Sequence, residues 1–152
     1  MKRKIIPGVI DGQQALCCLP PDASIAEAAD LMAERQIGAV LVVERGRLAG
    51  IVTERDLVYR VLAKRVEPGD TPLREVMTAR VDIVSPDDSA LEALEMMQKG
   101  RYRHLPVLRD GDLFGIISIR DLYEAVREGL QEELRGAESL IYGDQYGSGV
   151  PG

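Results

Sequence analysis

The stretch GIVTERDL at Gly50–Leu57 returns as GIISIRDL at Gly115–Leu122. In both copies an apolar run ends at a hydroxyl side chain, and Arg-Asp-Leu follows two residues later. A short apolar run predicts a buried strand, and a hydroxyl just before a helical pattern predicts a helix start. The chain therefore contains the same strand-to-helix junction twice.

The repeat extends beyond the two octapeptides. Residues 21–61 align with residues 86–126 without a gap, at the offset that separates Gly50 from Gly115. An ungapped internal match of this length indicates a duplicated unit. The identical pairs include Pro21/Pro86, Ser24/Ser89, Glu27/Glu92, Met32/Met97, Gly46/Gly111, Leu48/Leu113, Gly50/Gly115, Arg55/Arg120 and Asp56/Asp121.

The hydrophobic pattern predicts the element order β-α-β-β-α in each unit, which is a mixed α/β (α+β) fold. Ser24 and Ser89 are placed as helix N-caps, with Glu27 and Glu92 completing capping boxes. The predicted strands are Ala15–Leu19, Ala39–Val43 and Leu48–Val52 in the first unit, and Val81–Val84, Leu105–Leu108 and Leu113–Ser118 in the second. The closing helices are predicted at about 54–63 and 119–129, with a linker at Pro68–Pro72 between the units.

Composition narrows the possible functions. The net charge is −6 and aromatic residues make up only 4% of the chain, so neither phosphate-backbone binding nor base stacking by nucleic acid is expected. The sequence has neither a long apolar run nor a signal peptide, which predicts a cytoplasmic protein without a membrane segment. Cys17 and Cys18 are adjacent, a spacing that predicts neither a metal site nor a disulfide.

The motifs GIVTERDL, GIISIRDL, VMTARVDIVSPDDS and YRHLPVL resemble a tandem pair of cystathionine β-synthase (CBS) domains, also called a Bateman module. The resemblance covers about Val9–Gly129. It places the first repeat at 9–66 and the second at 72–130, with flanking segments at 1–8 and 131–152. It implies two repeats packed with pseudo-twofold symmetry, whose two clefts each bind an adenosine-containing ligand: AMP, ADP, ATP, S-adenosylmethionine or NADH.

Two interpretations of the junctions remain open. Thr53-x-x-Asp56 and Ser118-x-x-Asp121 fit helix caps that need no ligand. However, the other two helix starts use Glu, and the shorter Asp could instead accept hydrogen bonds from the two hydroxyls of a ribose. The resemblance implies that Asp56 and Asp121 bind ribose, and that the hydroxyls of Thr53 and Ser118 lie on the phosphate side.

The resemblance implies further ligand contacts. Arg103 and His104 stand where the family often has basic residues facing phosphates, although a lone histidine is also commonly structural. The first copy has Gly38-Ala39 there, so the two clefts are expected to differ. Thr78 and Arg80 are candidates for phosphate contact, although a solvated loop arginine is the other interpretation of Arg80. The base is expected in a slot of main-chain groups, which maps onto Cys18, Ala39, Val40, Ile83, His104 and Leu105.

The sequence contains no catalytic dyad, metal-ligand cluster or phosphate-binding loop, so no enzyme activity is expected. The resemblance instead implies a free-standing sensor that reports nucleotide occupancy to an unidentified protein partner. It also implies a homodimer, for which an apolar stripe is available: Leu57, Val58, Val61, Leu62, Leu122, Val126 and Leu130. The alternative is a purely structural dimerisation or docking module. The segment from Gly136 onward has the composition of a loose tail, although an arm that binds a partner is also possible.

Overall fold

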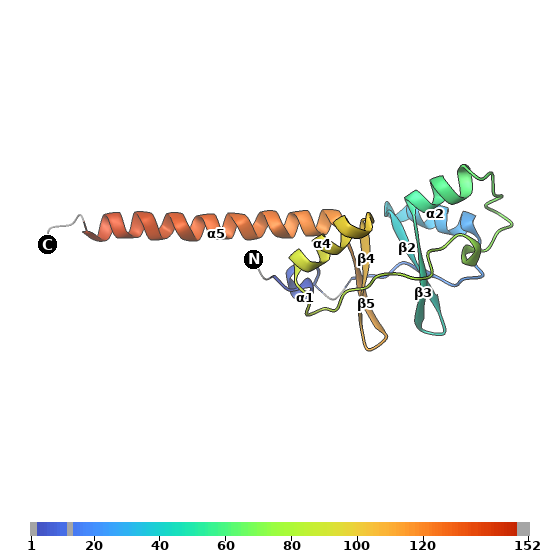
Figure 1. Ribbon diagram of the computed structural model, residues 1–152, viewed down its shortest axis with the longest axis horizontal. Helices are drawn as coiled ribbons and strands as arrows, with labels where there is room; N and C mark the ends of the chain where they lie inside the picture. The colour runs from blue at the N-terminus through green and yellow to red at the C-terminus, as the bar shows by residue number, and fades with distance from the viewer. Residues whose placement is uncertain (1–2, 12–13, 149–152) are drawn as a thin grey trace.

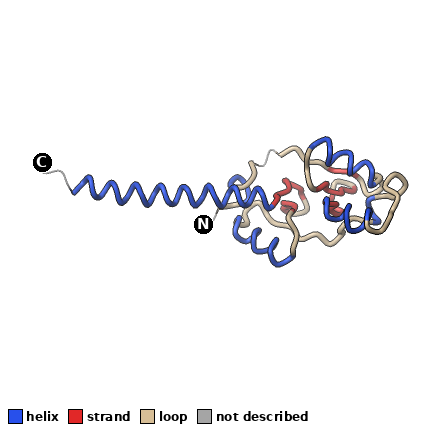
Figure 2. Tube along the Cα trace, turned by 90° about the horizontal axis from the view of Figure 1, so that it is seen from above, coloured by secondary structure: helices blue, strands red, loops and turns tan. Residues whose placement is uncertain are grey.

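The computed structural model describes residues 3–11 and 14–148, and for 142–148 it describes the backbone alone. Two β-hairpins lie side by side, each covered by helices, and one long C-terminal helix projects away from them (Figure 1). Seen from above, the strands of both repeats lie in the middle of the module, with helices around them (Figure 2). The predicted α+β fold is confirmed.

The first repeat forms a three-stranded sheet in the order β1-β2-β3. β1 is parallel to β2, and β2 is antiparallel to β3. β1 is shorter than predicted because only Cys18 and Leu19 pair with β2. The elements are β1 (Cys18–Leu19), α2 (Ile25–Arg35), β2 (Ala39–Glu44), β3 (Arg47–Thr53), α3 (Glu54–Asp56) and the π-helix η1 (Leu57–Leu62).

The second repeat has the same order with one strand reduced further. Its hairpin is a two-stranded sheet, and the predicted strand Val81–Val84 contributes only a parallel bridge from Val84 to Val107. The elements are the 3-10 helix η2 (Leu73–Glu75), α4 (Ala90–Gly100), β4 (His104–Arg109), β5 (Asp112–Ser118) and α5 (Ile119–Ser148). The short α1 (Ile5–Gly8) precedes both repeats.

Both hairpins turn in the same way. Arg45-Gly46 and Asp110-Gly111 each have positive φ at two consecutive residues, 53° and 77° in the first pair and 53° and 84° in the second. Two central residues with positive φ define the tight turn whose twist matches a right-handed hairpin, and glycine adopts this conformation without strain. The duplicated turn residues therefore set the same register in both repeats.

The two hydrophobic cores exchange segments of the chain. Ile5 lies ahead of the first repeat in sequence but is fully buried in the core of the second, beside Met97 and Leu105. Leu73 stands at the start of the second repeat in sequence but is fully buried in the core of the first. Main-chain hydrogen bonds hold each segment, such as Ile5 N–H to the Asp88 carbonyl at 2.9 Å and Leu73 N–H to the Ala23 carbonyl at 2.8 Å.

The duplicated glycines allow these segments to approach closely. A Cβ at Gly50 would lie 2.7 Å from the Thr78 carbonyl oxygen, and one at Gly115 would lie 2.8 Å from Oε1 of Gln14. The next amide is paired in both places: Ile51 N–H donates to the Thr78 carbonyl, and Ile116 N–H donates to the Gln14 side chain. Gly50 and Gly115 therefore serve close packing of the chain.

The C-terminal segment differs from the prediction of a loose tail. α5 continues without interruption to Ser148 and projects beyond both repeats (Figure 1). Arg3 pairs with Glu128 at 3.3 Å and with Glu132 at 2.9 Å, so the N-terminal segment supports the start of this extension. The composition concealed the helix because the isolated glycines weaken the helical pattern without ending it. No helix in the described part of the chain is long and apolar enough to cross a membrane.

The apolar stripe predicted for dimerisation is divided between two roles. Val61 and Leu122 are buried in the cores of their own repeats, and Leu57 packs against the first core. Val58, Leu62 and Leu130 stay exposed, together with Tyr59, Tyr123, Leu134, Leu140 and Ile141. The part of the stripe that faces each sheet is therefore core, and only its outer part is available to a partner.

The exchanged segments should contribute comparably to stability. We expect Ile5→Ala and Leu73→Ala each to lower the free energy of unfolding by about 3 kcal/mol, because each leaves a cavity in a fully packed core. Leu91→Ala is the control, because that side chain is 49% exposed on α4, outside the apolar stripe, and its loss should cost less than about 1 kcal/mol. Urea unfolding measures all three. If Ile5→Ala behaved like the control, the first segment would not belong to the second core.

Candidate ligand-binding cleft

A cleft of about 770 Å³ lies between the two repeats, and both strand-to-helix junctions open into it. We call Thr53, Glu54, Arg55 and Asp56 the first half-site, and Ser118, Ile119, Arg120 and Asp121 the second; all eight line the cleft. The duplicated octapeptides thus meet face to face across one continuous cavity. Its volume is within the range of cavities that bind drug-sized molecules.

Both aspartates close capping boxes. In the first half-site, Asp56 Oδ2 accepts from Thr53 N–H at 2.9 Å, and Asp56 N–H donates to Thr53 Oγ1 at 3.3 Å. In the second, Asp121 Oδ2 accepts from Ser118 N–H at 2.8 Å, and Asp121 N–H donates to Ser118 Oγ at 3.2 Å. One oxygen of each carboxylate therefore serves the helix start, as in the capping interpretation, which leaves the other oxygen for further contacts.

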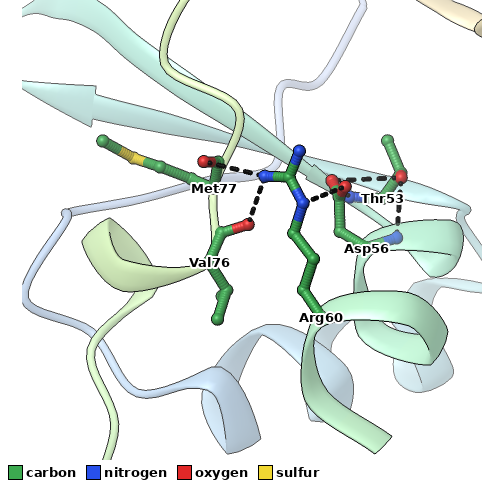
Figure 3. A network of polar contacts seen from close by, with 5 residues as sticks. All are labelled: Thr53, Asp56, Arg60, Val76 and Met77. Atoms are coloured by element: carbon green, nitrogen blue, oxygen red, sulfur yellow. Dashed lines mark hydrogen bonds and ion pairs between the residues drawn. The ribbon is translucent and has the colours of Figure 1, made fainter. Parts of the chain in front are cut away.

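The remaining carboxylate oxygens have different surroundings. Asp56 Oδ1 lies 3.7 Å from Nε of Arg60, whose Nη1 also donates to the carbonyls of Val76 and Met77 (Figure 3). Arg60 has Ala125 as its counterpart in the second repeat. Oδ1 of Asp121 has no hydrogen bond or ion pair with any described residue. The two half-sites are therefore unequal at the aspartate, a difference that the matching octapeptides conceal.

Five arginines line the cleft, against four carboxylates: Arg55, Arg80, Arg101, Arg103 and Arg120, with Glu54, Asp56, Asp82 and Asp121. This balance contrasts with the net charge of −6 on the whole chain. Among these arginines, only Arg80 and Arg103 are predicted from the sequence as ligand contacts. Arg55 and Arg120 were identifiable as members of the duplicated motif, whereas Arg101 carries no sequence signal because its placement depends on how the repeats pack.

His104 lines the cleft at the start of β4, between residues of both repeats. Burial lowers its pKa, and Arg103 lowers it too; Glu54 and Asp121 act in the opposite direction without outweighing burial. The imidazole is therefore mainly neutral at pH 7. Of the two interpretations left open for this residue, the structural one fits a neutral imidazole better than the phosphate-binding one. Arg103, which is exposed on the same rim, keeps its charge.

The residues predicted for the base slot are split by the alternation of strand faces. Ala39 and His104 line the cleft, as do Thr78 and Arg80. Val40 and Leu105 point into the cores and are fully buried, while Cys18 and Ile83 are exposed outside the lining. Side chains that do line the cleft include Cys17, Leu41, Ile51, Val81 and Ile116. Cys18, Val40, Ile83 and Leu105 can therefore take part only through their main chains.

One cleft contact has no counterpart in the first repeat. The hydroxyl of Tyr102 donates to Asp82 Oδ2 at 2.7 Å, and both residues line the cavity. Burial and this carboxylate raise the pKa of the Tyr102 phenol. The corresponding positions of the first repeat are Ile37 and Cys17. The second repeat thus adds a polar pair to the wall of the cleft where the first supplies apolar side chains.

The family model of the CBS domain matches this chain twice, at residues 1–63 and 73–128. The chain belongs to the CBS domain family. The two matches contain the two half-sites, one in each. The tandem CBS pair predicted from the doubled octapeptide is thereby confirmed.

Relatives agree with this assignment. An uncharacterized 17.7 kDa protein of Acidianus ambivalens is 39% identical over 108 residues, which cover 70% of this chain and 64% of that protein. The chain spans only 20% of the length of longer CBS-domain proteins of Arabidopsis thaliana.

Among solved structures, a protein with CBS domains from Burkholderia ambifaria MC40-6 has a TM-score of 0.76 and 38% identity, over 81% of this chain and 93% of that one. The CBS domain protein PAE2072 of Pyrobaculum aerophilum, solved in complex with AMP, has a TM-score of 0.66 and 29% identity, over 72% of this chain and 84% of that one. The CBS-pair architecture of this chain therefore occurs in a structure that holds an adenine nucleotide.

The lowered pKa of His104 makes stability depend on pH. The unfolded chain takes up a proton near the ordinary pKa of 6.5, whereas the folded chain does so at lower pH. Stability from the neutral imidazole is therefore complete above pH 6.5 and is lost as the pH falls below it. We expect the free energy of unfolding to drop more between pH 7.5 and 5.5 in the wild type than in His104→Gln. Urea titrations at both values measure this; the two proteins share every carboxylate, so equal drops would contradict the assignment.

Proposed function

We propose that this chain is a regulatory module that binds an adenosine-containing ligand in the cleft between its repeats and reports the occupancy to a partner protein. The observation that carries the proposal is the meeting of two Asp-bearing helix starts and five arginines in one cavity. Membership of the CBS family supports it, as does AMP in the complex of the relative PAE2072. We place the repeats at 9–66 and 72–130, joined through the cleft.

The residues fit the parts of a nucleotide. A carboxylate oxygen that is free of the cap can accept hydrogen bonds from the two ribose hydroxyls, as Oδ1 of Asp121 is placed to do. Arginines on the rim provide charge and forked donors for phosphate, with Arg103 and Arg120 next to the second half-site. We assign the apolar wall formed by Ala39, Leu41 and Ile51 to the adenine ring. Thr53, Ser118, Thr78 and Arg80 complete the proposed phosphate side.

Occupancy can act on a partner only if the ligand binds two arrangements of the repeats with different affinity. The cleft is suited to this because its walls come from both repeats, so a ligand that contacts both walls favours one relative position. Arg55 already links the repeats, since its Nη1 donates to the Arg101 carbonyl at 2.9 Å. A ligand phosphate that attracts the Arg55 guanidinium would compete with this contact. We propose that the repeats shift through contacts of this kind.

A structural module with no ligand is the second candidate, and α5 is the observation that favours it. Leu130, Leu134, Leu140 and Ile141 are each more than half exposed on the projecting part of this helix. A helix with several exposed leucines suits contact with another helix. We propose a homodimer for either function, formed through the outer faces of α5 and η1. A dimer that forms in the absence of nucleotide and ignores it would favour the structural function.

The binding proposal is tested by calorimetric titration with AMP, ATP, S-adenosylmethionine and NADH. We expect Asp121→Asn to weaken binding of the preferred ligand about tenfold or more, because it removes a charged hydrogen-bond acceptor. The double variant Asp56→Asn/Asp121→Asn should abolish binding.

The matched controls are Glu27→Gln and Glu92→Gln. These residues close the capping boxes of α2 and α4 outside the cleft, so their loss costs the same kind of helix-cap energy without touching the site. Equal loss of affinity in Glu92→Gln and Asp121→Asn would show that Asp121 acts only through folding. Silence of the wild type across all four ligands would reject an adenosine sensor and support the structural function.

A further inference from the structure

We propose that Arg60 holds the first half-site closed by tying Asp56 to Val76 and Met77, so that the second half-site binds ligand first. These two residues lie in the segment 68–78, which includes the predicted linker and is called the linker from here on. The inference rests on the proposed adenosine-binding function and names the residue that makes the two half-sites unequal. The observation behind it is the network of Thr53, Asp56, Arg60, Val76 and Met77 shown in Figure 3.

The network gives each carboxylate oxygen of Asp56 a partner in the protein. Oδ2 accepts from the Thr53 amide at 2.9 Å and from the Thr53 hydroxyl at 3.2 Å. Oδ1 faces Arg60 Nε at 3.7 Å, and only 12% of the Asp56 side chain is exposed. A ribose that is to bind Asp56 must therefore displace a guanidinium or the helix cap.

Arg60 is itself anchored. Its Nη1 donates to the Val76 carbonyl at 3.0 Å and to the Met77 carbonyl at 3.2 Å. A guanidinium can make these bonds and face a carboxylate at once because its donors form a rigid planar fork. An exposed ion pair alone would be weak, since ordering two free side chains costs entropy. Here the hydrogen bonds to the Val76 and Met77 carbonyls already order the Arg60 side chain, so its pairing with Asp56 costs less entropy.

The linker residues next to the Arg60 contacts also reach the cleft. Thr78 lines the cavity, and its N–H and carbonyl both pair with Ile51 in β3, at 2.9 and 3.0 Å. Met77 N–H donates to the Leu73 carbonyl at 2.8 Å, within the segment that seals the first core. From this linker the chain continues to Val84, in the core of the second repeat. A ligand that took Asp56 from Arg60 would therefore loosen a segment that joins the two halves of the molecule.

The second half-site has no such tie. Ala125 occupies the position that corresponds to Arg60, and it is buried with an exposed fraction of 3%. Within the described residues, Asp121 Oδ1 and the Ser118 hydroxyl proton have no partner in the protein. Asp121 can accept a ribose without breaking any of these contacts. The duplicated motif therefore provides a second half-site whose aspartate is free to bind a ligand and a first half-site whose aspartate is paired with Arg60.

Calorimetry with AMP on the full chain tests the order of binding. We expect the wild type to bind one AMP per chain tightly, with little change in Asp56→Asn. Arg60→Ala should strengthen a second binding event about tenfold, because the competent form of the first half-site is no longer rare. Adding Asp56→Asn to Arg60→Ala should remove that event. Arg60→Lys should fall between them, since an ammonium keeps the charge but lacks the fork.

Arg127→Ala is the matched control, because it removes the same charge from an exposed position that does not line the cleft. It should leave both binding events as in the wild type. Two equal sites in the wild type would overturn the proposal. So would weaker binding in Arg60→Ala, which would mean that Arg60 assists the ligand.

Hydrogen exchange without any ligand tests the tie separately. We expect exchange of the Met77 and Thr78 amides to be about tenfold faster in Arg60→Ala than in the wild type and in Arg127→Ala, because the anchored carbonyls of the linker are released. Unchanged exchange would overturn the tie. If neither the wild type nor any variant bound AMP, the proposed function would be wrong. The exchange rates would still show whether Arg60 holds the linker.

Discussion

The exchange of segments between the two hydrophobic cores is the constraint on which the rest of the structure depends. Ile5 completes the core of the second repeat, and Leu73 completes the core of the first. The second repeat cannot bury its apolar face with residues from one continuous stretch, because Ile5 lies ahead of the first repeat. The first core is continuous in sequence, but it extends past residues 68–72 to take in Leu73 and Val76. The packing of the two repeats is therefore linked, and it shapes the surface between them. The cleft between the repeats therefore depends on the packing of both cores.

The geometry of the cleft follows from the close approach of these segments to the strands. Gly50 and Gly115 leave room for Thr78 and Gln14, which pair with the amides of Ile51 and Ile116. The strands can therefore end with their helix starts facing each other across the cavity. In the first repeat the main-chain carbonyl of Thr78 accepts the strand N–H, and in the second repeat the side-chain amide oxygen of Gln14 accepts it. The same backbone position is thus satisfied by different chemistry, and pseudo-symmetry is kept without identical residues.

Function in such a module depends on the departures from symmetry. Both junctions carry the same capping box, but Arg60 and Ala125 give the two aspartates different surroundings. Tyr102 and Asp82 add a polar pair on one side alone. A perfectly symmetric cleft would treat two ligands alike. Under the proposed function, the two half-sites of this cleft differ in the contacts that a ligand must break.

The sequence by itself determined the duplication, the order of elements, the hairpin turns and the four capping boxes, because these depend on residues close together in the chain. It also pointed to Asp56 and Asp121, whose motif repeats at a fixed offset. The tertiary structure decided which strand faces meet the cleft, so that Cys17 and Leu41 line it while Val40 is core. It also decided the meeting of Arg60 with the linker, the placement of Arg101 on the cleft wall and the lowered pKa of His104. These depend on burial and on contacts between distant segments, which local patterns do not encode.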